Sequence, residues 1–406
     1  MSQDARGMLA AEMEEELRKD ILPFWPRFID PENGGFHGQV DNSGRPDPRA
    51  DKGLVMHARL LWTYSAAARL LKSPALLSTA DTAYRFLVER LYDRQQKGFS
   101  FACDYKGNRR PGLKIIYGQA FAVYALAEYA RAGGPGRALD LAMETFLLLQ
   151  RTAHDERCGG YCEAVAPDWS KSAASALGDG DIECAKSMNT NLHVLEALTA
   201  LQAATEDASV GRALRRQIEI HLDRIMTSAA HLGLYFDNDW SRLDTVISYG
   251  HDIEASWLLT EAAERTRDAQ LETRVRRCAL DVAAAIARIL DENQGSLPNE
   301  LKEGRLDTDR IWWVQAEGIV GMVNAAGLSG DPGYLRRASA LWGFVKAFLI
   351  DKVHGEWFWG VTHPGDAPLP DRYKGGAWKA SYHNGRACMQ IMSRLGHGEE
   401  GGTQQC

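Results

Sequence analysis

A short turn motif recurs along the whole chain, and this repeat limits the architectures that the chain can adopt. The motif begins with aspartate and contains a glycine, usually followed by an aromatic residue. Five clear copies read DPENGGFHG, DRQQKGFSF, DERCGGYCE, DENQGSLPN and DKVHGEWFW, starting at Asp30, Asp93, Asp155, Asp291 and Asp351. A degraded copy, AAHLGLYFD, begins at Ala229. Neighbouring copies are about 60 to 74 residues apart, so six similar units fill the 406 residues.

Each unit contains two stretches with helical character. One helix is expected to end at the turn, as in 136–152 and 269–290, and a second helix begins after it, as in 115–132 and 186–204. In 186–204 the apolar residues recur every three or four positions, which is helical spacing. The stretch 115–132 is apolar almost all round, which predicts an inner helix, whereas 208–221 carries charge on one face and suits an outer position. The other expected helices are 77–92, 208–228 and 331–349 of the first kind, and 53–72, 247–265, 308–326 and 378–395 of the second kind.

Six helical hairpins with buried second helices predict an all-α fold, an (α/α)6 barrel with a closed inner ring. Aromatic runs in the turns, such as 356–360, are expected to pair as short β-hairpins on the face that carries the active site. An open HEAT-type solenoid is the alternative, but neither end of the chain has an evident polar cap. We therefore expect one catalytic domain over residues 1–396, with the glycine-rich residues 397–406 as a flexible tail.

Charge and cysteine content narrow the classes of function. The chain has 47 Lys and Arg residues against 54 Asp and Glu residues, so its net charge is −7 and no nucleic-acid partner is expected. No apolar run approaches the roughly 18 residues of a membrane helix, and the N-terminus does not resemble a signal peptide. Seven dispersed cysteines suit a reducing compartment. We expect a cytoplasmic protein without membrane contact, as a monomer or weak homodimer.

Polar and aromatic residues interrupt the apolar inner helices near their starts, in every unit. Such groups are costly to bury unless they are paired or bind a ligand, and the helix starts of a barrel share one face. They predict a pocket with aromatic walls and directed polar groups, which suits a sugar. These residues are His57 and Arg59; Tyr117 and Gln119; Asn189, Asn191 and His193; His251, Asp252 and Glu254; Trp312, Trp313, Gln315 and Glu317; and Trp378, Tyr382, His383, Asn384 and Arg386.

The histidines of this set differ in what they predict. His251 and His383 occupy matching places in two units and have charged neighbours, which favours a role in the site. His57 and His221, by contrast, are expected to be core residues. The pair Trp312–Trp313 is equally compatible with the core and with the site.

No metal site is expected. Zinc sites usually contain two ligands close in sequence, whereas His193, His251 and His383 come from three separate helices. Cys158 and Cys162 have a suitable spacing, but no second ligand pair follows them.

Four stretches resemble the N-acylglucosamine 2-epimerase superfamily. They read KSMNTNLHVLEAL from Lys186, YGHDIEASWLLT from Tyr249, IWWVQAEGI from Ile311 and WKASYHNGRACMQ from Trp378, and the similarity covers almost the whole chain in order. The resemblance implies an (α/α)6 barrel, in agreement with the repeat, and a carbohydrate isomerase that needs no cofactor. The string at Tyr249 resembles the branch that acts on disaccharides more than the branch that acts on N-acetylglucosamine.

The resemblance also implies roles for individual residues. His251 and His383 resemble an acid/base pair, and His193 resembles a histidine that assists ring opening or the intermediate. The residues that resemble substrate contacts are Arg59, Tyr117, Asn189, Glu254, Trp313, Glu317 and Trp378. The implied reaction is reversible epimerisation at C2 of the reducing-end glucose in β-1,4-linked disaccharides such as cellobiose and lactose.

The residue types suit this chemistry. Epimerisation at C2 removes a proton alpha to the open-chain aldehyde and returns one on the other face, which two bases on opposite sides achieve. Histidine fits because its unperturbed pKa of about 6.5 allows one ring to be neutral and the other charged. Arg59, a protonated His193 and the helix N-termini would stabilise the enediolate, and Trp313 and Trp378 would stack on sugar rings.

Other functions are compatible with the same residues. Within the family, these are an N-acylglucosamine 2-epimerase or a monosaccharide aldose–ketose isomerase. An inverting glycoside hydrolase would need two carboxyl groups roughly 6.5–9.5 Å apart, and the candidates are Asp181, Glu183, Glu254 and Glu317. A non-catalytic helical scaffold would use the Trp/His face as a protein interface.

Overall fold

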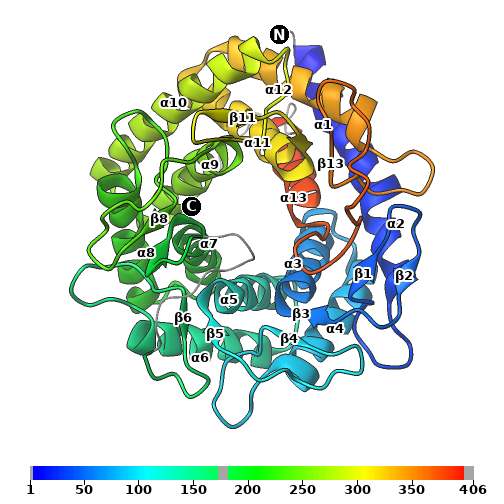
Figure 1. Cartoon of the computed structure of the whole chain (residues 1–406), viewed down its shortest axis with the longest axis vertical. Coiled ribbons are helices and arrows are strands. Elements are labelled where there is room, and N and C mark those ends of the chain that lie inside the picture. Colours follow the sequence, from blue (N-terminus) through cyan, green and yellow to red (C-terminus); the bar gives the residue numbers. More distant parts are fainter. Residues whose placement is uncertain (1–2, 172–181, 397–406) are drawn as a thin grey trace.

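The computed structural model describes residues 3–171 and 182–396, and in these residues the helices form two concentric rings (Figure 1). The inner ring consists of α3 (Leu54–Leu70), α5 (Ile116–Arg131), α7 (Met188–Thr205), α9 (Tyr249–Thr266), α11 (Trp312–Ser329) and α13 (Tyr382–Leu395). The outer ring consists of α1 (Gln3–Glu16), α4 (Leu77–Phe86), α6 (Gly136–Thr152), α8 (Ala208–Ile220), α10 (Ala269–Glu292) and α12 (Pro332–Phe344). The predicted (α/α)6 barrel is confirmed.

Packing between helices shows that the inner ring is closed. Consecutive inner helices contact one another from α3 to α13, and α13 in turn contacts α3. The outer helix α1 packs against α13, so the first and last helices of the chain form the sixth hairpin and seal the barrel (Figure 1). Burial follows the predicted pattern, because α5 is buried almost all round whereas α8 buries one face only. An open solenoid is therefore excluded.

Several outer helices continue into a five-residue π-helical turn. These turns are Leu17–Ile21, which leads on into the short helix α2 (Leu22–Phe24), and Leu87–Leu91, His221–Ile225 and Val345–Leu349, where the helix ends. Together with the turns, the expected helices 77–92 and 331–349 match the structure closely. The expected helices 308–326 and 378–395 start about four residues too early, because Arg310–Ile311 form a strand and Lys379 closes a turn onto Gly376.

The recurring aspartate has a structural explanation. In the first unit, Asp30 Oδ1 accepts the backbone N–H groups of Glu32 and Asn33, and Oδ2 lies 2.7 Å from Nζ of the buried Lys52. The lysine stands directly before an inner helix, so each such pair ties a turn to the helix start. Asp93 and Asp155 pair with Lys114 and Lys186 in the same way, whereas Asp351 pairs with Lys374, which lies eight residues before α13.

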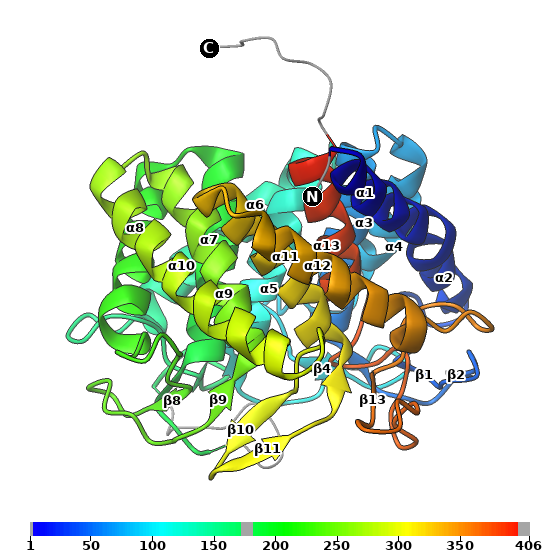
Figure 2. The ribbon, with the colours of Figure 1, turned by 90° about the horizontal axis from the view of Figure 1, so that it is seen from above.

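Short antiparallel strands gather at one end of the barrel (Figure 2). Most join the segment before an inner helix to the loop of the next unit. The cross-unit pairs are β3 (Lys52–Gly53) with β4 (Ala102–Cys103), β5 (Lys114–Ile115) with β6 (Ala164–Val165), β7 (Lys186–Ser187) with β8 (Tyr235–Phe236), and β12 (Arg310–Ile311) with β13 (Gly360–Val361). Local hairpins form at β1 (Gln39–Val40) with β2 (Pro46–Asp47), and at β10 (Glu300–Lys302) with β11 (Arg305–Asp307), where β10 also pairs with β9 (Ile247–Ser248).

The prediction of hairpins within the turns is only partly correct. The turn at Asp351 is closed by one isolated bridge, between Ile350 and Trp357, rather than by paired strands over 356–360. The tight aspartate turn leaves room for a single bridge, and the chain then continues to a neighbouring unit. No helix within the described ranges is long and apolar enough to cross a membrane. The predicted tail, 397–406, lies outside the described residues.

Candidate active site

One set of polar residues near the inner-helix starts holds the turns rather than lining a site. Gln119 Oε1 accepts the backbone N–H of Phe99 at 2.9 Å, and Gln315 Oε1 accepts that of Leu297 at 2.8 Å. The equivalent residues His57, Asn191 and Asp252 accept N–H groups of the other turns in the same way. The prediction that this set lines the pocket is therefore wrong. His57 and His221 are fully buried, as expected of core residues.

A second set, two positions further along each inner helix, points into the ring. A step of two residues along a helix changes the direction of the side chain by roughly 200° around the helix axis. The side chains of the second set therefore face away from the turns. Their contacts with one another cross the ring: Arg386 reaches two carboxylates of the set, and Arg59 lies over the Phe121 ring at 4.6 Å. The set is Arg59, Phe121, His193, Glu254, Glu317 and Arg386.

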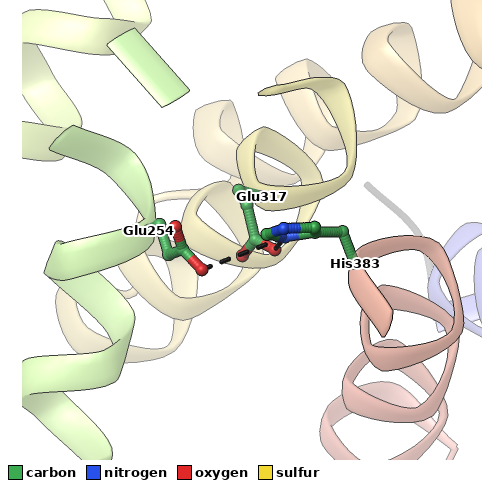
Figure 3. A group of neighbouring side chains, drawn as sticks. All are labelled: Glu254, Glu317 and His383. Carbon is green, nitrogen blue, oxygen red and sulfur yellow. Dashed lines mark hydrogen bonds and ion pairs between the residues drawn. The ribbon is translucent and has the colours of Figure 1, made fainter. Parts of the chain in front are cut away.

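His383 is held by a carboxylate from the neighbouring helix. Its Nδ1 atom lies 2.6 Å from Oε1 of Glu317, and the two side chains point toward each other from α13 and α11 (Figure 3). Burial, together with the charges of Arg59 and Arg386, lowers the pKa of His383 well below its ordinary value. A lowered pKa favours the neutral ring, and a carboxylate acceptor favours the tautomer with the proton on Nδ1, in which Nε2 carries a lone pair.

His251 occupies the equivalent position on α9 but has a neutral partner. Its Nδ1 atom lies 2.7 Å from Oγ of Ser248, one helical turn earlier. The indole of Trp313 is next to both histidines, with ring-centroid distances of 4.7 Å to His251 and 5.6 Å to His383. Burial, with a smaller contribution from His193, lowers the pKa of His251 to about 3. His251 and Trp313 both keep part of their surface exposed.

His193 has a carboxylate partner on its own helix. Its Nδ1 atom lies 2.9 Å from Oε2 of Glu196, and its ring meets the edge of Tyr117 at 5.0 Å. Burial alone would raise the pKa of Glu196, but Arg386 and the hydrogen bond from His193 outweigh burial and lower it to about 2. Glu196 is thus an ionised acceptor that holds the proton of His193 on Nδ1.

Arg59, Tyr117 and Trp378 form the other side of the cluster. Arg59 Nη2 donates to the hydroxyl of Tyr117 at 2.9 Å, and Nη1 donates to the backbone carbonyl of Trp378. The Tyr117 and Trp378 rings are 5.9 Å apart, and Trp378 is partly exposed. Because Tyr117 also touches His193, contacts run without a break from Trp378 to that histidine.

Several buried polar atoms in this cluster have no hydrogen-bond partner among the described residues. They include Oε2 of Glu254, Oδ1 of Asn189, Nε of Arg59, Nε of Arg386 and Nε1 of Trp312. An unpaired buried polar atom costs roughly 1–3 kcal/mol, which a ligand rich in hydroxyl groups would recover. Asn189 lies one helical turn before His193, so both face the same side of α7. Burial and the neighbouring Glu317 raise the pKa of Glu254 to about 7.

The structure thus places the predicted residues in one cluster, and adds three that the sequence analysis did not assign. Arg386 is among the polar residues that interrupt the apolar inner helices, but the sequence alone does not assign it a role. Glu196 follows His193 by three residues, and Ser248 precedes His251 by three residues. Such spacing puts both partners on the histidine's own helix face, and this signal would have found them.

One group in the described part of the chain has the geometry of a metal site. Glu254, Glu317 and His383 offer ligand atoms that lie within 4.8 Å of one another (Figure 3). However, Nη2 of Arg386 lies 2.5 Å from Glu254 and 2.6 Å from Glu317, so a guanidinium already provides the positive charge there. Cys158 and Cys162 do not complete a zinc site, since their sulfur atoms contact Asp239 and the Ala164 carbonyl.

Comparison with known proteins identifies the family of the chain. The family model described as N-acylglucosamine 2-epimerase matches residues 34–387. A cellobiose 2-epimerase of Bacteroides fragilis is 41% identical over 388 residues, which cover 95% of this chain and 99% of the relative. The solved cellobiose 2-epimerase of Spirochaeta thermophila is 45% identical, with a TM-score of 0.90 over 96% of this chain and 97% of the other. The solved cellobiose 2-epimerase of Bacillus thermoamylovorans is 37% identical, with a TM-score of 0.90 over 95% of this chain and 99% of the other. The chain therefore belongs to the N-acylglucosamine 2-epimerase family and is an isomerase of the carbohydrate epimerase class.

Proposed function

We propose that the chain epimerises C2 of the reducing-end glucose in a β-1,4-linked disaccharide, converting cellobiose to glucosyl-mannose and lactose to epilactose. The observation that carries the proposal is the pair His251 and His383 at equivalent helix positions, with the Trp313 indole next to both rings. In both rings Nδ1 is engaged, by Ser248 and by Glu317. Nε2 of each is then the atom that exchanges a proton with the substrate.

The two histidines act on the open-chain aldose. One neutral Nε2 takes the proton from C2, and the electron pair of the C–H bond forms the enediolate with negative charge on O1. The other histidine, protonated, gives its Nε2 proton to the opposite face of C2, which restores the aldehyde as the epimer. Burial lowers the pKa of both rings, so each is neutral and able to accept a proton before the reaction. The carboxylate of Glu317 would stabilise the imidazolium that forms when His383 takes a proton.

Charged and aromatic neighbours would support the intermediate and the sugar. Arg59 and His193, joined through Tyr117, would stabilise the charge on O1 in a site with little water. Trp313 and Trp378 are partly exposed, so each offers a ring face for stacking. The unpaired atoms of Asn189 and Glu254 would bind sugar hydroxyl groups. The disaccharide substrate is supported by relatives named cellobiose 2-epimerase at 37–41% identity.

The carboxyl groups do not suit an inverting hydrolase. Glu254 and Glu317 share the same nitrogen of Arg386, and their oxygens lie within 4.8 Å, which is closer than the roughly 6.5–9.5 Å that an attacking water requires. Glu183 is exposed, and Asp181 lies outside the described residues.

The proposal is tested by incubating the protein with cellobiose in D2O and following C2 by NMR. We expect glucosyl-mannose to appear with deuterium at C2 and the chain length of the sugar to stay constant. Release of glucose would instead identify a hydrolase. Conversion of free glucose or N-acetylglucosamine without conversion of cellobiose would move the chain to the monosaccharide enzymes of the family.

A further inference from the structure

We propose that Arg386 is a positioning residue that couples His193 to His383, because it holds both carboxylates that bind the Nδ1 atoms of these histidines. The inference rests on the proposed function only in giving the two histidines a part in catalysis. The coupling itself is a property of the protein without substrate.

The guanidinium of Arg386 uses its two terminal nitrogens in different directions. Nη2 donates to Oε1 of Glu317 at 2.6 Å and to Oε1 of Glu254 at 2.5 Å. Nη1 donates to Oε1 of Glu196 and to the hydroxyl of Tyr382, and that hydroxyl donates to the same Glu196 oxygen at 2.5 Å. One planar group therefore fixes carboxylates from α7, α9 and α11 at once, a geometry that a point charge does not reproduce.

The hydrogen-bond network around Arg386 ends at a histidine on each of two sides. Oε2 of Glu196 binds Nδ1 of His193 at 2.9 Å, and Oε1 of Glu317 binds Nδ1 of His383 at 2.6 Å. A continuous path of hydrogen bonds thus runs from His193 through Glu196, Arg386 and Glu317 to His383. All five side chains are buried, so water does not substitute for a lost link.

Aromatic rings restrict the guanidinium to this orientation. Its carbon lies 4.6 Å from the centre of the Trp257 ring and 4.3 Å from that of Tyr382. Trp257 also donates from Nε1 to Oε2 of Glu317 at 3.0 Å, which fixes the carboxylate that Arg386 binds. Because the guanidinium has little freedom, a change in its hold on one carboxylate alters its hold on the others.

The balance of charge explains why the coupling matters for proton transfer. One guanidinium faces three buried carboxylates, of Glu196, Glu254 and Glu317. The other charged or titratable groups that influence His383 are Arg59, His193 and His251. If Glu196 loses its charge, Arg386 is attracted only toward Glu254 and Glu317, and Glu317 then holds the Nδ1 proton of His383 less strongly. The state of one histidine is in this way transmitted to the other.

In the test, each variant changes a carboxylate that contacts one histidine, and the decisive signal is that of the other histidine. Glu196→Gln keeps the shape of the side chain and its acceptor for His193, but removes the negative charge that Arg386 binds. With the ring nitrogens labelled with 15N and no sugar present, we expect Glu196→Gln to shift the Nδ1 and Nε2 resonances of both His193 and His383. The reciprocal variant Glu317→Gln is expected to shift both as well. Asp252→Asn is the matched control, because Asp252 is a buried carboxylate that binds His231 and Leu232 instead; it should leave both histidines unchanged.

Arg386→Lys tests the requirement for a guanidinium. A lysine keeps the charge but reaches fewer of the four acceptors, so kcat with cellobiose should fall about 100-fold while KM stays within about threefold. Adding Glu196→Gln to Arg386→Lys should then produce no further shift at His383, which a double-mutant cycle measures. A shift confined to His193 in Glu196→Gln, or an Arg386→Lys variant with unchanged kcat, would overturn the proposal. If Arg386→Lys does not fold, the shifts in the two glutamine variants decide the question, and they do so even if cellobiose is not the substrate.

Discussion

His383 Nδ1 and Glu317 Oε1 lie 2.6 Å apart, whereas His251, at the equivalent position on another inner helix, has the hydroxyl of Ser248 at 2.7 Å. The repeat thus supplies two histidines in matching places with different partners, one anionic and one neutral. A carboxylate stabilises an imidazolium that forms next to it, so His383 has an anionic partner for an added proton and His251 does not. We expect this difference to decide how the two rings share proton transfer in the proposed reaction.

Replacement of either histidine by alanine should remove epimerisation. In the proposed mechanism, His251→Ala and His383→Ala each delete a proton-transfer group, and such groups contribute roughly 10²–10⁴-fold to rate. We expect kcat/KM for cellobiose to fall at least about 100-fold in both variants. Circular dichroism and thermal unfolding should show that the barrel stays intact. A variant that keeps more than about a tenth of the wild-type rate would argue against an essential role for that histidine.

The repeat made much of this site predictable. It fixed the order of inner and outer helices, and polar residues within apolar inner helices identified His193 and Glu317 as unusual. Sequence spacing did not separate residues that hold the turns, such as Gln119, from those that face the ring, because the two sets are only two positions apart. The hydrogen bond between Arg386 and Glu196 could not be predicted either, because these residues are 190 positions apart and come into contact only when the ring of inner helices closes.

Removal of divalent ions should not change the rate. The only described group with metal-site geometry is occupied by the guanidinium of Arg386, and a second cation there would be repelled. After dialysis against EDTA, turnover of cellobiose is expected to equal that of the untreated protein. Activity that disappears and is restored by one particular divalent ion would instead indicate a metal-dependent isomerase.

The seam where α1 meets the last unit should make stability depend on pH. Glu16 accepts from Trp357 Nε1 at 2.8 Å, and Asp20 accepts the backbone N–H of Glu356 at 2.9 Å. Burial, and then the charge of Asp20, raises the pKa of Glu16 to about 8. A raised folded-state pKa gives stability that is complete at acidic pH and is lost as the pH rises through 8. Glu16→Gln keeps an acceptor for Trp357 without the charge, so its Tm should exceed that of the wild type by about 3 °C at pH 9 and match it at pH 5.

A glutamate on the same helix provides the control. Glu12 lies 2.6 Å from Nζ of Lys346 and accepts from Trp342 at 2.7 Å. Burial alone would raise the pKa of Glu12, but these partners lower it, so its ionised form stabilises the folded state. Glu12→Gln should therefore lower Tm at pH 9. An equal effect of Glu16→Gln at both pH values would show that Glu16 does not titrate at the seam.

The length of the sugar should affect the rate of epimerisation. Trp313 is next to His251 and His383, whereas Trp378 contacts Arg59 and Tyr117, so we expect the two indoles to stack on different sugar rings. A disaccharide should then exceed free glucose in kcat/KM, because binding of the second ring positions the reacting end. Trp378→Ala should reduce this advantage roughly five- to tenfold, since an aromatic contact contributes about a kcal/mol. Rates should be compared for glucose, N-acetylglucosamine, cellobiose and lactose. Trp169→Phe is the control, because Trp169 donates to the Gln96 carbonyl in a loop and should leave the ratio unchanged. If glucose and cellobiose react equally well in the wild type, Trp378 does not form a second subsite.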